Sequence, residues 1–288
     1  MVKNPFALLR SALGTISLHP VVLFPFCLMG FVQLLILELL FFAPREPLAS
    51  FFGPLIHRFA DDIYLHYPYN FVLLERWYSS GNLQIPVFVL LNSFLIGSVI
   101  VIIHAINEHQ KVRISQIFRR TLGRYVHLVM ASVILVGVLY GLSHGYGLLI
   151  QRAAQIRSTT GHFFLIKQFV IQGWPYVKLL ISCLTTTLLA FTFPLIVLER
   201  KNVFSAFFLN FARYYKAFGT IFAVILLSSL LYVPILLLKT YRQWYESIMI
   251  PELWVVIPVM GMIVMLFVDA LQVAAVTTYY LFDREASQ

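Results

Sequence analysis

The sequence is poor in charged residues. Charged side chains make up 11% of its 288 residues, against about 25% in a typical soluble domain. Hydrophobic residues make up 60%, which is well above the usual ~45–50%. A soluble fold cannot cover its surface with so few charges, so we expect the lipid bilayer to be the solvent. The same abundance of apolar residues excludes an intrinsically disordered chain.

Cysteine and catalytic motifs are also scarce. The two cysteines, Cys27 and Cys183, both lie within apolar runs, which excludes a disulfide scaffold and a thiolate zinc site. There is no P-loop, and the GxSxG pattern at residues 141–145 lies inside an apolar run rather than at a strand-to-helix turn, so we treat it as a chance match. We therefore predict that the protein is not an enzyme and has no cofactor. The formal charge of +9 is explained by membrane topology, so we predict no nucleic-acid partner.

Long apolar runs dominate what is present. A transmembrane helix needs about 20 apolar residues, and six runs are long enough. They are Pro20–Ala43, Ile85–Ile106, Tyr125–Ile150, Trp174–Leu198, Phe218–Leu238 and Trp254–Phe282. The sequence thus predicts an all-α polytopic membrane bundle that occupies residues 1–288 as one integral membrane domain. Proline within a helix removes a backbone hydrogen bond, so we expect kinks at Pro25, Pro194, Pro234 and Pro258.

The distribution of basic residues predicts the orientation. The two termini and loops 107–124 and 199–217 together hold 12 Lys and Arg residues, whereas the three loops on the other side hold 9. Loops rich in Lys and Arg stay in the cytoplasm. We therefore predict a bacterial inner-membrane protein with both termini in the cytoplasm.

Three short segments on the predicted cytoplasmic side have the periodicity of amphipathic helices, which lie in the membrane interface with the apolar face down. The apolar face of the N-terminal segment holds Phe6, Leu9, Leu13 and Ile16. Asn4 and Pro5 are suited to begin this helix. The apolar face of segment 112–125 holds Ile114, Ile117, Phe118, Thr121, Leu122 and Tyr125. That of segment 203–218 holds Phe204, Phe207, Phe208, Phe211, Tyr215 and Phe218, with Asn210 on the opposite face.

Basic residues line the opposite faces of the second and third segments. They are Arg113, Arg119, Arg120, Arg124, Arg213 and Lys216. Each basic residue near an anionic membrane surface is worth about 1 kcal/mol. These side chains are predicted to hold anionic lipid headgroups or an acidic membrane-protein partner. The alternative is that they only fix the topology during insertion.

A weak internal repeat links residues 108–125 with residues 199–215. Each copy has an acid, basic residues, a Val, a Ser after Ile or Phe, and then an Arg and a Tyr. The N-terminal helix and the last apolar run resemble the two halves of a third copy. The pattern favours a pseudo-threefold ring of helix pairs, and shared hydropathy alone is the alternative explanation.

Residues 96–135 and 191–227 resemble a group of bacterial six-span membrane proteins. The resemblance is carried by the stretches Ile100–Ala105, Val112–Ser115 and Phe193–Glu199, and by Val203–Phe207. The group includes the YciC-like family and the membrane domain that precedes some glycerophosphodiester phosphodiesterases. The resemblance implies a six-helix fold without established catalysis.

Asp269 is the polar residue of greatest interest because it lies near the middle of the last apolar run. A carboxylate at that depth costs at least about 2.5–3.5 kcal/mol on insertion scales, so it should face the interior of the bundle. Its candidate partners at similar depth are Gln33, Asn92, Thr185 and Thr186. The residue either relays a proton or ion, or forms an interhelical hydrogen bond that fixes packing.

A metal site has weaker support in the sequence. His104 and Glu108 are spaced to share a helical face, and His109 and His127 are the remaining candidate ligands. No known metal motif has this spacing, so we predict no metal. The resulting hypothesis is a non-enzymatic accessory or scaffold subunit in envelope or lipid processes. The alternative is a secondary transporter or channel with a polar path around Asp269.

Overall fold

The computed structural model describes residues 4–42, 84–155, 162–240 and 256–287, together with 45–47, 50, 51, 54 and 58. These residues form helices and connecting turns, with no strand among them. Six helical segments of the described chain are long and apolar enough to cross a membrane. The predicted all-α polytopic membrane bundle is therefore confirmed.

Several of the spans are built from more than one helical element. The first span consists of η1 (Pro20–Leu23) and α2 (Phe24–Phe42). The third is the single helix α8 (Tyr125–Gln155), and the sixth is the single helix α16 (Val256–Ser287). The second combines α5 (Gln84–Val87), η4 (Phe88–Asn92) and α6 (Ser93–Asn107). The fourth combines α10 (Trp174–Leu188) and α11 (Thr192–Leu198), and is preceded by α9 (His162–Gln172). The fifth combines α13 (Phe218–Ser229), η6 (Leu230–Tyr232) and α14 (Val233–Thr240).

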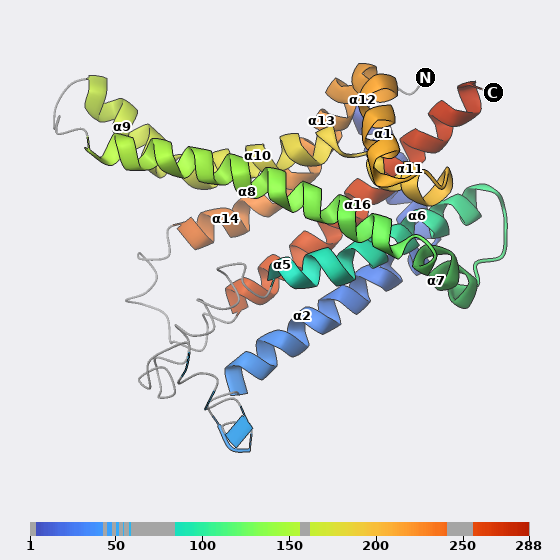
Figure 1. The fold of residues 1–288 in the computed structure, drawn as a ribbon, viewed down its shortest axis with the longest axis horizontal. Coiled ribbons are helices and arrows are strands. Elements are labelled where there is room, and N and C mark those ends of the chain that lie inside the picture. The colour runs from blue at the N-terminus through green and yellow to red at the C-terminus, as the bar shows by residue number, and fades with distance from the viewer. Residues whose placement is uncertain are drawn as a thin grey trace.

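Both termini lie at the same end of the bundle, which we call the terminal side (Figure 1). Three short helices lie there: α1 (Pro5–Leu18), α7 (Ile114–Leu122) and α12 (Val203–Tyr214), which continues into η5 (Tyr215–Ala217). Asn4 caps α1 through its side chain, which accepts a hydrogen bond of 3.0 Å from the Phe6 amide, and Pro5 stands in the first turn. This cap agrees with the prediction.

The faces that α1 and α12 bury differ from the predicted ones, whereas α7 buries two residues of its predicted apolar face. In α1 the buried residues are Leu8, Ala12 and Ile16, while Phe6 and Leu13 are exposed. The buried residues of α7 are Ile117 and Thr121, and those of α12 are Val203, Ala206, Asn210 and Tyr214. The prediction assumed a single apolar contact with lipid. Each helix instead packs one side against the bundle and leaves other apolar side chains exposed.

Three of the four prolines expected to kink a span lie at a helix interruption. The fourth span breaks between Leu188 and Thr192, just before Pro194. The first and fifth spans pass through the 3-10 segments η1 and η6 just before Pro25 and Pro234. Pro258 instead lies in the first turn of α16. Proline is tolerated in a first turn because its missing N–H has no helical partner there.

The packing of the terminal side supports the repeat. α7 packs against α6, α12 against α11, and α1 against α16, so each short helix contacts a long span that ends beside it. The spans α6 and α11 end in the same way, with Glu108 followed by His109 and Glu199 followed by Arg200. Both following residues have a left-handed backbone, with φ of 53° and 56°. This shared geometry is more specific than shared hydropathy.

The hydrophobic core is concentrated on the terminal side. It is formed by buried residues of α1, α6, α11, α13 and α16, which include Leu8, Ile100, Leu195, Ile221 and Ala274. Small residues allow close approach at some contacts. A Cβ atom on Gly97 would lie 2.7 Å from Cδ1 of Leu128. The bundle is thus tightly packed on the terminal side. The polar residues of its interior lie further from the termini.

Candidate intramembrane cavity

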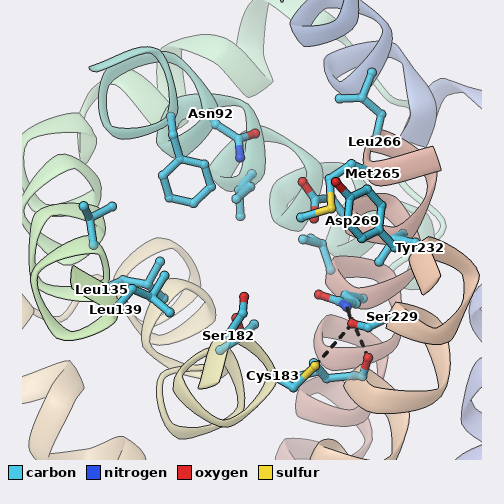
Figure 2. A pocket seen from close by; sticks show the side chains of 18 of the residues that line it. Asn92, Leu135, Leu139, Ser182, Cys183, Ser229, Tyr232, Met265, Leu266 and Asp269 are labelled. Atoms are coloured by element: carbon cyan, nitrogen blue, oxygen red, sulfur yellow. Dashed lines mark hydrogen bonds between the residues drawn. The ribbon is translucent and has the colours of Figure 1, made fainter. Parts of the chain in front are cut away.

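A cavity of about 740 Å³ lies among the spans. Its walls come from α2, η4, α6, α8, α10, α13 and α16. Figure 2 shows that Asn92, Leu135, Ser182, Ser229 and Asp269 surround the same space although they belong to five different elements. Pockets of roughly 300–1,000 Å³ typically hold small molecules, so this cavity is large enough for a ligand.

Asp269 lies on the face of α16 that lines the cavity. Most of the residues that this helix contributes recur at a helical spacing of three and four: Pro258, Gly261, Met262, Met265, Leu266, Val268, Asp269, Gln272, Val273, Val276 and Thr277. Asp269 is 13 residues after Val256, which places it about 20 Å along the helix at 1.5 Å per residue. It is half-buried, and it has no hydrogen bond or ion pair with any residue that the structure describes. In Figure 2 its neighbours are Met265 and Tyr232.

The structure brings together most of the polar residues proposed to accompany Asp269. Gln33 from α2, Asn92 from η4 and Thr186 from α10 line the same cavity. Thr185 does not, because it is fully buried and its hydroxyl donates a hydrogen bond of 2.8 Å to the Ile181 carbonyl of its own helix. Neighbouring residues on a helix point in directions about 100° apart, so Thr185 and Thr186 have different surroundings.

Two polar atoms in the cavity wall are buried without a partner. They are Oδ1 of Asn92 and Oγ1 of Thr277, in side chains that are 3% and 1% exposed. A buried polar atom without a hydrogen bond costs about 1–3 kcal/mol. Figure 2 shows the Asn92 side chain pointing toward the cavity, with its amide nitrogen nearer to the open space than Oδ1.

A hydrogen-bonded cluster that the sequence analysis missed joins three spans at one wall. The Gln272 amide of α16 donates hydrogen bonds of 3.1 Å to the hydroxyls of both Ser228 and Ser229 of α13. The Cys183 thiol of α10 donates a contact of 3.4 Å to the Ser229 hydroxyl (Figure 2). The spacing within α16 could have indicated this polar wall, because Gln272 and Thr277 follow Asp269 by three and eight residues and so share its helical face.

Two lysines lie at the end of the cavity away from the termini. The Lys239 ammonium donates a hydrogen bond of 3.1 Å to the Tyr232 hydroxyl and lies 5.7 Å from the centre of that ring. Lys178 is exposed near the start of α10. Positive charge therefore lines the opening, whereas the middle of the cavity holds the carboxyl group of Asp269.

Ion pairs and aromatic rings close the bundle on the terminal side. The Tyr280 hydroxyl donates a hydrogen bond of 2.6 Å to Oε1 of Glu199. Arg213 lies 3.6 Å from Glu199 and 3.9 Å from Asp283. Phe191 stacks on Tyr214 at 4.1 Å between ring centres. Arg213 therefore pairs with two carboxylates of the protein while its side chain stays 36% exposed, and its predicted contact with lipid or a partner stays a prediction.

The remaining predicted basic residues lie on the surface of the terminal side. Arg113, Arg119 and Arg120 of the α7 region are exposed, and Arg124 is half-buried. Lys216 is exposed with its ammonium 5.8 Å from the Tyr215 ring. Exposed aromatic residues cover the outer face of α12 beside it: Phe204, Phe208, Phe211 and Tyr215. This combination suits the membrane interface.

Asn210 was predicted on the polar face of α12 and is instead buried at the break of the fourth span. Its amide donates to the Leu188 carbonyl, and its Oδ1 accepts a hydrogen bond of 3.2 Å from the Phe191 amide. The interruption of a helix leaves backbone groups unpaired. Asn210 satisfies two of them.

The candidate histidine cluster forms an internal contact. Nε2 of His104 lies 3.2 Å from Oε1 of Glu108, one turn further along the chain. In the described parts of the chain, no group of three or more His, Cys, Asp and Glu side chains is arranged to hold a metal ion. Residues 44–83, between the first and second spans, lie largely outside the described residues.

Comparisons with protein-family models, with curated proteins and with solved structures give no match to this chain. The resemblance to YciC-like six-span proteins therefore stays a prediction. The cavity and the exposed surface of the terminal-side helices are the two features of the protein that can indicate a function.

Proposed function

We propose that this integral membrane protein is a transporter or channel whose pathway passes through the cavity around Asp269. The observation that carries this proposal is the shared cavity of Asp269, Gln33, Asn92 and Thr186 from four different spans. Polar residues inside membrane proteins are costly, and they commonly mark substrate or ion pathways. No enzymatic step is part of the proposal.

The residues next to the cavity indicate that it is closed at its terminal-side end. Its lining on α16 reaches Thr277, and the next turn presents Tyr280, which is fully buried and bonded to Glu199. Opening this end requires separation of α16 from α11. Transport then proceeds by alternating this closed form with one in which the terminal side is open, and the bacterial cytoplasmic membrane with cytoplasmic termini is the proposed setting.

Cysteine accessibility tests this mechanism. In a background with Cys27→Ser and Cys183→Ser, single cysteines are placed at Ser182 and Val276, which both line the cavity. A membrane-impermeant thiol reagent should reach Ser182→Cys from the side opposite the termini and Val276→Cys from the terminal side. Gln116→Cys on exposed α7 reports that the reagent has access to the terminal side. Transport is contradicted if Gln116→Cys reacts fully there while Val276→Cys never does.

The accessory or scaffold role is the second candidate. It is favoured by the exposed arginines 113, 119 and 120 and by the exposed aromatic face of α12. Such a surface binds anionic headgroups or an acidic membrane-protein partner without needing the cavity. The two candidates differ because scaffolding tolerates a permanently closed terminal side.

A further inference from the structure

We propose that the cavity binds a lipophilic organic cation, whose charged group lies beside Asp269 and whose apolar body lies against the surrounding methionine and aromatic side chains. This inference rests on the proposed function, because it names the class of substrate for the same pathway.

The charge distribution favours a cationic ligand. Asp269 is the one acidic side chain among the described residues that line the cavity, and it has no partner among the described residues. The two basic lining residues, Lys178 and Lys239, stand near the ends of α10 and α14. Gly261 is the α16 residue beside Lys239, and it precedes Asp269 by eight residues, or about 12 Å of helix. A ligand cation beside Asp269 pairs with a carboxylate that none of the described cations occupies.

The walls suit the apolar part of such a ligand. Three methionines line the cavity, Met29, Met262 and Met265, and their flexible thioethers fit ligands of varied shape. Aromatic rings line it as well: Phe88, Tyr140, Phe193 and Tyr232. Cations are attracted to the faces of such rings. Met265 precedes Asp269 by one helical turn and lies beside it in Figure 2, so a thioether and the carboxylate face the cavity together.

Asn92 adds a polar side chain to the same wall. It points toward the cavity in Figure 2, and its Oδ1 atom is buried without a partner. The described residues hold no carboxylate, histidine or thiolate cluster for a metal ion. The cavity of about 740 Å³ is also far larger than a bare ion needs.

Tetraphenylphosphonium and tetraphenylborate test the inference because they share a shape and differ in the sign of their charge. Each is titrated into the full-length protein in nanodiscs, with empty nanodiscs as the background, and binding is measured by equilibrium dialysis. We expect saturable binding of the phosphonium, and Asp269→Asn should weaken it about tenfold or more, which corresponds to one lost ion pair. The matched control is Glu38→Gln, which removes an exposed carboxylate of α2 outside the cavity lining and should leave binding unchanged.

A second pair of variants keeps the test informative if Asp269→Asn does not fold. Tyr232→Leu removes the ring beside the proposed cation site and should weaken phosphonium binding, whereas Tyr232→Phe should retain it. The inference is overturned if Asp269→Asn binds like the wild type, if the borate displaces the phosphonium with equal affinity, or if sodium chloride at millimolar concentration displaces it. Each of these results leaves the labelling of Val276→Cys unaffected, so transport and ligand class are tested separately.

Discussion

The hydroxyl of Tyr280 on α16 donates a hydrogen bond of 2.6 Å to Glu199, the residue at which α11 ends. This bond joins the sixth span directly to the fourth on the terminal side. Arg213 from α12 contacts the same carboxylate, so three elements meet at one charged group. The bond lies one turn beyond Thr277, the last cavity residue of α16.

Tyr280→Phe should therefore weaken the closed end of the bundle. The variant loses a hydrogen bond to a charged group, which contributes about 1.5–3 kcal/mol, and the aromatic packing is retained. We expect a lower unfolding midpoint in a denaturant titration of the detergent-solubilised protein. Tyr279→Phe is the adjacent control, and an equal midpoint shift in both variants would argue against the role of the Tyr280 hydroxyl.

Asn210→Ala should destabilise the protein more than Asn202→Ala. The first change leaves the Leu188 carbonyl and the Phe191 amide without their buried partner, at a cost of about 2–3 kcal/mol. The second removes the cap of α12, a bond of 2.8 Å to the Ser205 amide, which costs about 1 kcal/mol. Unfolding titrations of both variants give the comparison. If the order were reversed, the break in the fourth span would not depend on Asn210.

Gly97→Ala should be harmful where Gly141→Ala is not. A Cβ atom at Gly97 meets Leu128 at 2.7 Å and Thr121 at 2.9 Å, whereas nothing lies within 4 Å of one at Gly141. Overpacking of this kind costs about 1–3 kcal/mol. The expected readout is a lower yield and a lower thermal midpoint for Gly97→Ala alone. Wild-type behaviour of both variants would contradict the close contact between α6 and α8.

The orientation predicts opposite labelling of the two ends of the bundle. Gln116 on α7 and Lys178 on α10 are both exposed, and they belong to opposite ends. In intact cells, an impermeant thiol reagent should label Lys178→Cys and spare Gln116→Cys, since loops rich in Lys and Arg remain in the cytoplasm. In inside-out vesicles the pattern should invert. Labelling of Gln116→Cys in intact cells would place the termini outside.

Arg119→Gln combined with Arg120→Gln tests whether the surface of α7 binds anionic lipid. Both side chains are exposed, and each contributes about 1 kcal/mol near an anionic surface. The double variant should retain fewer anionic lipids during purification, and the wild type should lose them as salt increases. If the double variant retained as much anionic lipid as the wild type at every salt concentration, these arginines would have a role only in membrane topology.

Much of the fold could be predicted because it depends on local properties of the sequence. The six spans follow from the length and hydropathy of the runs, and the cap at Asn4 follows from residues that are neighbours in the chain. The buried faces of α1 and α12 could not be predicted in this way. Burial of Asn210 depends on a break in another span, which its own helix does not reveal.

The site was predictable in the same partial sense. The depth of Asp269 in an apolar run pointed to the interior, and residues at similar depth proved to line one cavity, except Thr185. Depth alone gives no angular information, so two adjacent threonines were treated alike. Gln272 and Thr277 were missed because a single glutamine or threonine in an apolar helix does not by itself indicate a site. Their role becomes visible only when it is known which face of α16 lines the cavity.

The packing of α1 against α16 has a consequence for how the protein is made. α1 precedes α16 in the chain by five membrane spans, yet the two helices pack against each other. Leu8, Ala12 and Ile16 therefore cannot reach their final neighbours until α16 has been synthesised. A chain truncated before α16 would keep five spans and still leave α1 without the helix against which it packs.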